Sequence, residues 1–309
     1  MQITYIAPLS NAWNRMLKSL FKPFDIKKWF VLGFTAFLAQ LLEWKGGSSG
    51  ENNSGDFNVG EFLKLPQDAM DWMDKNPDWA TLIILGIALI FGIIILCIWL
   101  SSRGKFMFLD NVIHNRALVK KPWAEYRDVA HSLFLWRLGF GLVAFSILGS
   151  YFSYIYFQIY DMYTAYASDN EMIFAAIRMG IFFIILAIAV AYILLFLNDF
   201  IVPLMYKNNT SVWIAWSHFM PLFTKHFIYF ILYGILVLFL HIFLFIIVMI
   251  LGLMTCCIGF VFLVIPYISS VVLLPISMIF RAFSVEFLEQ FDPQNKYFPE
   301  DSEGLETAG

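Results

Sequence analysis

The sequence predicts an all-α, polytopic integral membrane protein with six transmembrane helices. Of its 309 residues, 60% are hydrophobic and only 14% are charged, whereas a soluble domain carries about 25% charged residues. Mean hydropathy is +0.73, and the chain holds 34 Phe and 10 Trp, which suit lipid contact and interfacial anchoring. Six stretches approach or exceed the roughly 20 apolar residues that a spanning helix needs.

The six predicted spans follow one another along a single integral membrane domain, residues 1–296. The first is short and is bracketed by Trp29 and Trp44, and the second is the most uniformly apolar. The sixth contains Pro266 and Pro275, which predict a kink because proline breaks the helical hydrogen-bond ladder. In chain order the spans cover about residues 29–44, 79–100, 132–157, 173–197, 227–251 and 256–280.

Two segments lie outside these spans. Residues 45–78 form the predicted outer loop between the first two spans. Its Gly/Ser/Asn-rich first part, 45–60, predicts a flexible linker, and the remainder predicts a short amphipathic helix lying on the outer surface. Residues 297–309 are predicted to form an acidic disordered tail.

Lysine and arginine predict the orientation, because short cytoplasmic loops are enriched in them. They gather in the N-terminal stretch, in the loop between spans two and three, and to a smaller extent after span four. Residues 45–78 hold three cations against seven acids, and residues 158–172 hold no cation. We therefore expect a protein of the cell membrane with both termini in the cytoplasm.

Three similar stretches precede the odd-numbered spans, and each interleaves tryptophan and apolar residues with polar ones at helical spacing. This pattern predicts cytoplasmic interfacial helices, anchored by Trp13, Trp123, Trp213 and Trp216. The stretches read NAWNRMLKSLFKPFDIKKWFVLGF from Asn11, KPWAEYRDVAHSLFLWRLGFGL from Lys121, and VWIAWSHFMPLFTKHFIYFILYGI from Val212.

A second landmark favours an internal repeat. The hexapeptides KFMFLD, DFIVPL and AFSVEF occupy equivalent places after spans two, four and six. We therefore predict three repeats, each an interfacial helix followed by a transmembrane hairpin. The alternative is chance similarity, because interfacial tryptophan and flanking cations are common in membrane proteins.

The stretch RGKFMFLDNVIHNRALVKKPWAEYRDVAHSLFLWRLGFGL from Arg103, with a weaker echo over residues 198–236, resembles the membrane domain attached to some bacterial glycerophosphodiester phosphodiesterases and related uncharacterised membrane families. The soluble catalytic barrel of those enzymes is absent from this sequence, together with its metal and its acid/base chemistry. The resemblance therefore implies a fold and carries no activity with it.

Charged residues near the span ends are the candidate site residues, because burying charge in a membrane is costly and usually functional. Arg103, Asp199 and Arg281 occupy similar positions in the three repeats. With Asp110 and Glu286 they could form a cytoplasmic vestibule for an anionic head group or a partner's charge. The alternative is ion pairing between repeats. We expect no acid or base at mid-span, which counts against a proton-coupled pump.

Two groups have the helical spacing of metal ligands. Asp110 and His114 are four residues apart, and Glu125, Asp128 and His131 follow at steps of three. The ordinary alternative is a solvated helix face paired with neighbouring cations. The sequence lacks CxxC, GxSxG, HExxH and P-loop motifs, so we expect no metal site, no cofactor and no catalytic residue. No basic run suggests nucleic acid.

The function that these features favour is a non-enzymatic multi-pass membrane protein that binds lipids or membrane partners in a scaffold, assembly or envelope-maintenance role. Its expected partners are membrane lipids, other membrane proteins or a second copy of the chain. One alternative is a transporter or channel for an amphiphilic or small solute, favoured by the repeat and the predicted kink. Another is a membrane-surface enzyme acting through His114, Asp110 and Glu125.

Overall fold

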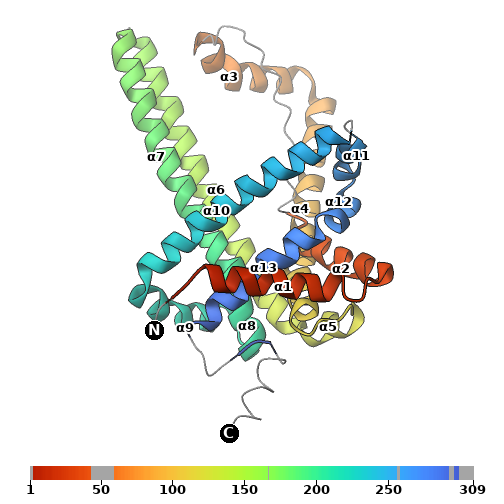
Figure 1. The fold of residues 1–309 in the computed structure, drawn as a ribbon. Helices are drawn as coiled ribbons and strands as arrows, with labels where there is room; N and C mark the ends of the chain where they lie inside the picture. The colour runs from red at the N-terminus through yellow and green to blue at the C-terminus, as the bar shows by residue number, and fades with distance from the viewer. Residues whose placement is uncertain (1–2, 43–58, 166, 256–257, 292–295, 299–309) are drawn as a thin grey trace. The chain divides into compact units, whose positions relative to one another are not determined.

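A computed structural model describes residues 3–42, 59–165, 167–255, 258–291 and 296–298, and every element within them is a helix (Figure 1). Most of the predicted linker, residues 45–58, lies outside the described residues. The helix predicted to follow the linker is present as α3. The helices are α1 (Ile6–Leu20), α2 (Ile26–Ala39), α3 (Val59–Lys75), α4 (Pro77–Ile113), α5 (Lys120–Glu125), α6 (Arg127–Thr164), α7 (Asp169–Phe196), the π-helix η1 (Leu197–Ile201), α8 (Val202–Asn208), α9 (Val212–Lys225), α10 (Phe227–Met254), α11 (Ile258–Val264), α12 (Pro266–Val272) and α13 (Leu274–Glu289).

Four helical stretches in the described residues are long and apolar enough to cross a membrane, or five if one bent pair counts as a single span. They are α4, α6, α10 and the continuous stretch 170–208. This is fewer than the six predicted. The predicted first span corresponds to α2, whose 14 residues measure about 21 Å at 1.5 Å per residue, short of the roughly 30 Å hydrocarbon core.

The predicted sixth span is divided into α11, α12 and α13. Pro266 begins α12 and Pro275 is the second residue of α13. Together, helices α12 and α13 are long and apolar enough to cross a membrane, but they are bent by 65° relative to each other. The predicted kink is confirmed, and its cause is that proline is tolerated in the first turn of a helix and disrupts its interior.

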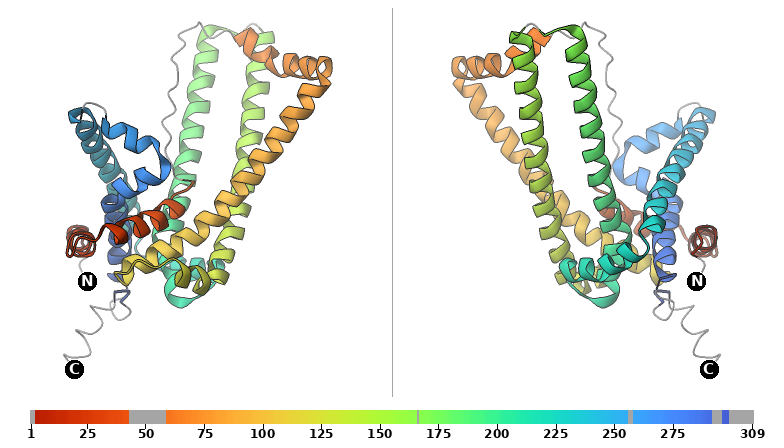
Figure 2. Two further views of the ribbon diagram at one scale, coloured as in Figure 1. Left: turned by 90° about the vertical axis from the view of Figure 1, so that its right-hand side faces the viewer. Right: turned by 90° about the vertical axis from the view of Figure 1, so that its left-hand side faces the viewer.

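The contacts divide the chain into two compact units, and the single membrane domain over residues 1–296 stays a prediction. Unit 1 comprises residues 1–46, 97–136 and 192–309, and unit 2 comprises residues 47–96 and 137–191. Helices α4, α6 and α7 each contribute residues to both units. Figure 2 shows these three helices from the side.

Unit 2 is built from α3, the part of α4 up to residue 96, the part of α6 from residue 137 and the part of α7 up to residue 191. Helices α6 and α7 run alongside each other (Figure 2) and are joined at Tyr151, whose hydroxyl donates to the Met179 carbonyl at 2.5 Å. Helix α3 is joined to α6 where the Tyr156 hydroxyl donates to the Leu63 carbonyl at 3.0 Å. Most of the large apolar side chains of this unit are exposed.

Unit 1 has a core of aromatic rings supplied by η1, α9, α10 and α13. Phe200 lies at its centre, with its ring centroid 5.5 Å from that of Phe219, 5.0 Å from Phe230 and 4.9 Å from Tyr233. Phe287 of α13 completes the cluster 4.7 Å from Tyr233. Edge-to-face and offset pairs of this kind contribute beyond their buried area.

Helix α2 buries one face in unit 1, with Leu32 and Ala36 on it, and exposes Phe30 on the other. It packs on α12 and is crossed by α4 at Gly104, where an added Cβ would lie 2.5 Å from the backbone nitrogen of Ala39. The Ser101 hydroxyl donates to the Ala39 carbonyl at 2.9 Å. Glycine is needed at position 104 because the two backbones approach so closely.

Residues 296–298 return to the surface of unit 1. Phe298 is buried, with the Arg15 guanidinium carbon 3.6 Å from its ring centroid. The Tyr297 amide donates to the Glu289 carboxylate at 2.5 Å. Two residues assigned to the predicted tail, residues 297–309, therefore pack on the folded unit, and the others lie outside the described residues.

Candidate functional site

Asp110, near the C-terminal end of α4, is fully buried and joins three segments of unit 1. Its carboxylate accepts hydrogen bonds from Arg116 Nε at 3.1 Å and from Arg116 Nη2 at 2.7 and 2.8 Å. It also accepts one from the Tyr206 hydroxyl of α8 at 2.9 Å. His114 Nδ1 lies 3.3 Å from the same carboxylate.

Asp110 also shifts the pKa of the Arg116 guanidinium. Partial burial lowers the pKa of the Arg116 guanidinium, but the hydrogen bonds and negative charge of Asp110 outweigh this effect and raise the pKa above its ordinary value. A bidentate guanidinium–carboxylate pair is among the strongest polar contacts in proteins. Asp110 therefore fixes the loop after α4 and the adjoining end of α8.

The π-helix η1 is the second polar centre. It continues α7 into α8, and wider π-helical turns within α-helices recur at functional sites. Arg281 of α13 donates from Nη1 to the Asn198 carbonyl at 2.7 Å. The buried Tyr233 hydroxyl of α10 donates to the Asp199 carboxylate at 3.0 Å. Helices α10 and α13 therefore meet neighbouring residues of η1.

Glu286 and Arg103 have separate surroundings. Glu286 of α13 is nearly buried and accepts from Arg15 Nε at 2.5 Å and from Asn11 Nδ2 at 3.0 Å, which joins α1 to α13. The Arg103 guanidinium lies over Trp99 and Trp123, 4.8 and 4.7 Å from their ring centroids. Such cation–π contacts hold a charge against an apolar surface.

The five predicted vestibule residues are therefore distributed over unit 1. Asp199 and Arg281 meet at η1, whereas Asp110, Glu286 and Arg103 each have their own partners. Most of these contacts join helices that are far apart in the sequence. Such contacts are what the alternative interpretation, ion pairing between repeats, would produce. The vestibule stays a prediction.

The four predicted anchors fall into two pairs. Trp13 of α1 and Trp213 of α9 are 53% and 72% exposed. Trp123 contacts Arg103 as described, and Trp216 stacks on Trp136 with centroids 5.9 Å apart. The first pair is the more exposed, as suits an interfacial anchor, whereas Trp123 and Trp216 are half-buried.

The residues with metal-ligand spacing form no cluster of three His, Cys, Asp or Glu side chains within the part of the chain that the structure describes. Asp110 is already paired with Arg116 and Tyr206, so its oxygens are engaged by donors. His114 is the single imidazole beside it.

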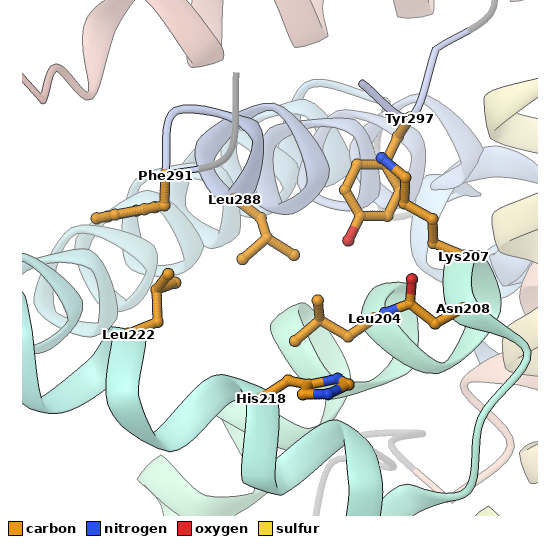
Figure 3. A pocket seen from close by; sticks show the side chains of 8 residues that line it. All are labelled: Leu204, Lys207, Asn208, His218, Leu222, Leu288, Phe291 and Tyr297. Carbon is orange, nitrogen blue, oxygen red and sulfur yellow. The ribbon is translucent and has the colours of Figure 1, made fainter. Parts of the chain in front are cut away.

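A cavity of about 230 Å³ lies between α8, α9 and the end of α13 in unit 1. Figure 3 shows that its polar side chains gather towards one end and its apolar ones towards the other. Its polar residues come from segments that no sequence pattern links, so the sequence did not predict this cavity. The lining residues are Leu204, Lys207, Asn208, His218, Leu222, Leu288, Phe291 and Tyr297.

One ionisable residue contradicts the expectation that the spans carry no acid or base at mid-length. His241 lies at the middle of α10. Its Nδ1 lies 2.8 Å from the Val237 carbonyl, and its ring stacks on Phe280 with centroids 4.1 Å apart. The expectation was wrong because a single histidine barely lowers the mean hydropathy of a 28-residue apolar helix.

The long apolar helices define the chain as a membrane protein by length and composition. The chain belongs to DUF7544, a family of unknown function whose model matches residues 4–287. No curated protein and no solved structure matches the chain.

Proposed function

We propose that this chain is a non-enzymatic multi-pass protein of the cell membrane that binds lipids or membrane partners, in a scaffold, assembly or envelope-maintenance role. The observation that carries the proposal is the exposure of its long helices. In the most apolar 18-residue stretch of α4, no residue is buried within the protein. In the corresponding stretch of α6, only 6% of the residues are buried. Apolar surface of this extent needs lipid or another membrane protein around it.

The proposed interfacial helices support membrane binding on one side. Helix α1 buries Ala12 and Met16 against unit 1 and exposes Ile6 and Trp13. Helix α9 buries Ala215 and Phe219 and exposes other apolar side chains, Trp213 and Ile214 among them. A helix that is packed on one face and still exposes tryptophan on the other suits the boundary between membrane and water.

The proposed threefold repeat is supported by the burial of the three hexapeptides, whereas the resemblance to the phosphodiesterase-linked membrane domain stays a proposal from the sequence. Each lies in a helix of unit 1 and each contributes a deeply buried phenylalanine, namely Phe106, Phe200 and Phe283. Shared burial of equivalent residues is what three related hairpins packed through one core would produce. The proposed orientation, with both termini cytoplasmic, rests on the distribution of Lys and Arg.

Purification in mild detergent tests the proposal. We expect mass spectrometry to find specific lipids, a partner protein or a second copy of the chain retained through size exclusion. An unrelated multi-pass protein of similar size, purified in parallel, gives the background. Retention no greater than that background would overturn the proposal.

Transport of an amphiphilic or small solute is a second candidate, favoured by the 65° bend between α12 and α13. Broken helices in transporters present free backbone groups to a substrate. This candidate predicts flux of solute into liposomes that contain the protein, and a change in flux on Pro275→Ala. Absence of flux for charged, sugar-like and amphiphilic test solutes would count against it.

A further inference from the structure

The turn that joins α1 to α2, residues 21–25, and one face of α2 bear large apolar side chains on the surface of unit 1 (Figure 1). Phe21 and Phe24 are exposed within the turn. Ile26, Phe30 and Phe34 follow on α2 at steps of four, which places them on one face of the helix, and all three are exposed. A contiguous apolar surface of this kind marks a contact with lipid or with another apolar surface.

The exposed rings of the turn are held in place by contacts within unit 1. The Trp29 ring centroid lies 5.6 Å from that of Phe21 and 5.7 Å from that of Phe24. Trp29 Nε1 donates to the carbonyl of the last residue of α1 at 2.9 Å. Lys28 Nζ donates to Asn115 Oδ1 at 2.8 Å, which joins the turn to the segment after α4. Rings fixed in this way enter a contact with little loss of side-chain freedom.

Positive charge gathers at the same end of the apolar face. Residues 18–30 hold four lysines and one acid, Asp25. The side chains of Lys22 and Lys27, on either side of Asp25, are exposed. Asp25 is the N-cap of α2, and its Oδ1 accepts from the backbone amides of Lys27 at 2.8 Å and Lys28 at 3.4 Å. Because the helix dipole offsets a carboxylate at this position, the turn favours a negatively charged surface.

The dimensions of the apolar face fit one leaflet of a bilayer. From Ile26 to Phe34 it measures about 12 Å at 1.5 Å per residue, which is within the roughly 15 Å of hydrocarbon in one leaflet. Lysine stems can lie along apolar surface while their ammonium groups reach the head groups. Zwitterionic lipid would cover the apolar face, but the excess of positive charge favours anionic lipid, by about fivefold for each lysine near the surface.

We propose that the α1–α2 turn and the exposed face of α2 dock into one leaflet of the bilayer, with Lys22 and Lys27 on the head groups of anionic phospholipids. Phe24, Ile26 and Phe30 then lie among the upper parts of the acyl chains. This inference rests on the proposed function, since it names the class of lipid that the protein gathers and the surface that gathers it.

Quenching by brominated lipids tests the site on the full chain in liposomes. A bimane label is attached at Ile26→Cys, or at Phe145→Cys in α6 as the reference, with the native cysteines replaced by serine. The liposomes hold equal amounts of phosphatidylcholine and phosphatidylglycerol, and one of the two is brominated near the top of its acyl chains. We expect brominated phosphatidylglycerol to quench the label at 26 about threefold more than brominated phosphatidylcholine does. Both should quench the label at 145 equally, because no lysine or arginine lies within four residues of it.

Removal of the two lysines tests their role directly. Lys22→Gln combined with Lys27→Gln should abolish the preference for phosphatidylglycerol at position 26, while phosphatidylcholine still quenches the label because the apolar face remains. Lys75→Gln combined with Lys225→Gln, at exposed residues of α3 and α9, removes the same charge elsewhere and should leave the preference unchanged. Raising the salt concentration from about 0.05 M to about 0.5 M should also reduce the preference without any substitution, because salt screens exposed charges.

The two labels separate failure of this site from failure of the proposed function. Equal quenching of the label at 26 by both lipids, or a preference that survives loss of both lysines, would overturn the assignment to anionic lipid. If neither lipid quenches the label at 26 while both quench the label at 145, the turn lies outside the bilayer, the site is refuted and the proposed function stands. If neither position is quenched, the proposed function itself is refuted.

Discussion

Units 1 and 2 are both helical but are stabilised in different ways. Unit 1 contains the aromatic core and the buried polar contacts of Asp110, Asp199 and Glu286. In the described part of unit 2, the buried apolar side chains are Leu63, Tyr151, Ala175 and Met179. Unit 1 therefore has a packed core beside the largely exposed helix α10, whereas unit 2 leaves most of its apolar side chains exposed.

This difference predicts which substitutions should lower the free energy of unfolding. Within a bilayer, lipid solvates apolar side chains as well as another helix does, and the helical backbone satisfies its own hydrogen bonds. Substitutions of exposed residues in unit 2 should therefore cost little, whereas those of buried residues in unit 1 should create cavities or unpaired charges.

The largest effect is expected for Phe200→Ala in the aromatic core. Phe200 is fully buried among rings of η1, α9, α10 and α13, and removing such a side chain costs about 3–5 kcal/mol. Phe145→Ala in unit 2, where the side chain is exposed, should change the free energy of unfolding by less than about 0.5 kcal/mol. Denaturation by sodium dodecyl sulfate from mild detergent, followed by circular dichroism, measures both. Equal losses would remove the distinction between the units.

Asp110→Ala should be the next most costly change. It leaves Arg116 and the Tyr206 hydroxyl without their acceptor, and breaking a buried ion pair costs about 3–5 kcal/mol. The Arg116 side chain is 27% exposed, so water compensates in part and we expect the lower value, about 3 kcal/mol. Asp161→Ala in unit 2, at an exposed residue, is the control in the same assay. A loss for Asp110→Ala no larger than for the control would show that the pair adds nothing.

The helices that were predicted best from the sequence are the long apolar ones, because their composition alone identifies them. Four of the six predicted spans correspond to α4, α6, α7 and α10, because a long apolar run satisfies the membrane criterion without any partner. The orientation, the repeat and the vestibule are not tested by the packing within the units. Of the predicted anchors, Trp13 and Trp213 are exposed because they lie opposite the packed face of their helices.

The sequence failed where tertiary contacts decide the outcome. Helix α2 resembles a short span because it is apolar, but one of its faces packs against α12 and α4, and its 14 residues are fewer than a spanning helix needs. The cavity was missed because Lys207, His218 and Tyr297 come from three separate elements. Hydropathy also could not reveal His241, since one polar residue hardly changes an apolar average.

A pair of glycines offers a smaller test with effects of opposite sign. Gly104→Ala in unit 1 would place a Cβ 2.5 Å from the Ala39 backbone nitrogen, and overpacking of this kind costs about 1–3 kcal/mol. Gly86→Ala in α4 of unit 2 meets nothing within 4 Å. It should stabilise the helix by about 0.5–1 kcal/mol, because alanine has the higher helix propensity. Both changes are read as midpoints of detergent-induced unfolding, and destabilisation by Gly86→Ala would point to an undescribed contact at α4.

The smallest effect on stability is expected at the exposed tryptophan of α9 in unit 1. Trp213→Cys removes an exposed ring and should change the free energy of unfolding by less than about 0.5 kcal/mol, so a spin label there reports depth with little perturbation. In liposomes, with the native cysteines replaced by serine, we expect a label at 145 to favour oxygen collisions, as in hydrocarbon. A label at 161 should favour a water-soluble nickel complex, and one at 213 should lie between them. A label at 213 as accessible to nickel as that at 161 would show that α9 does not lie at the membrane surface.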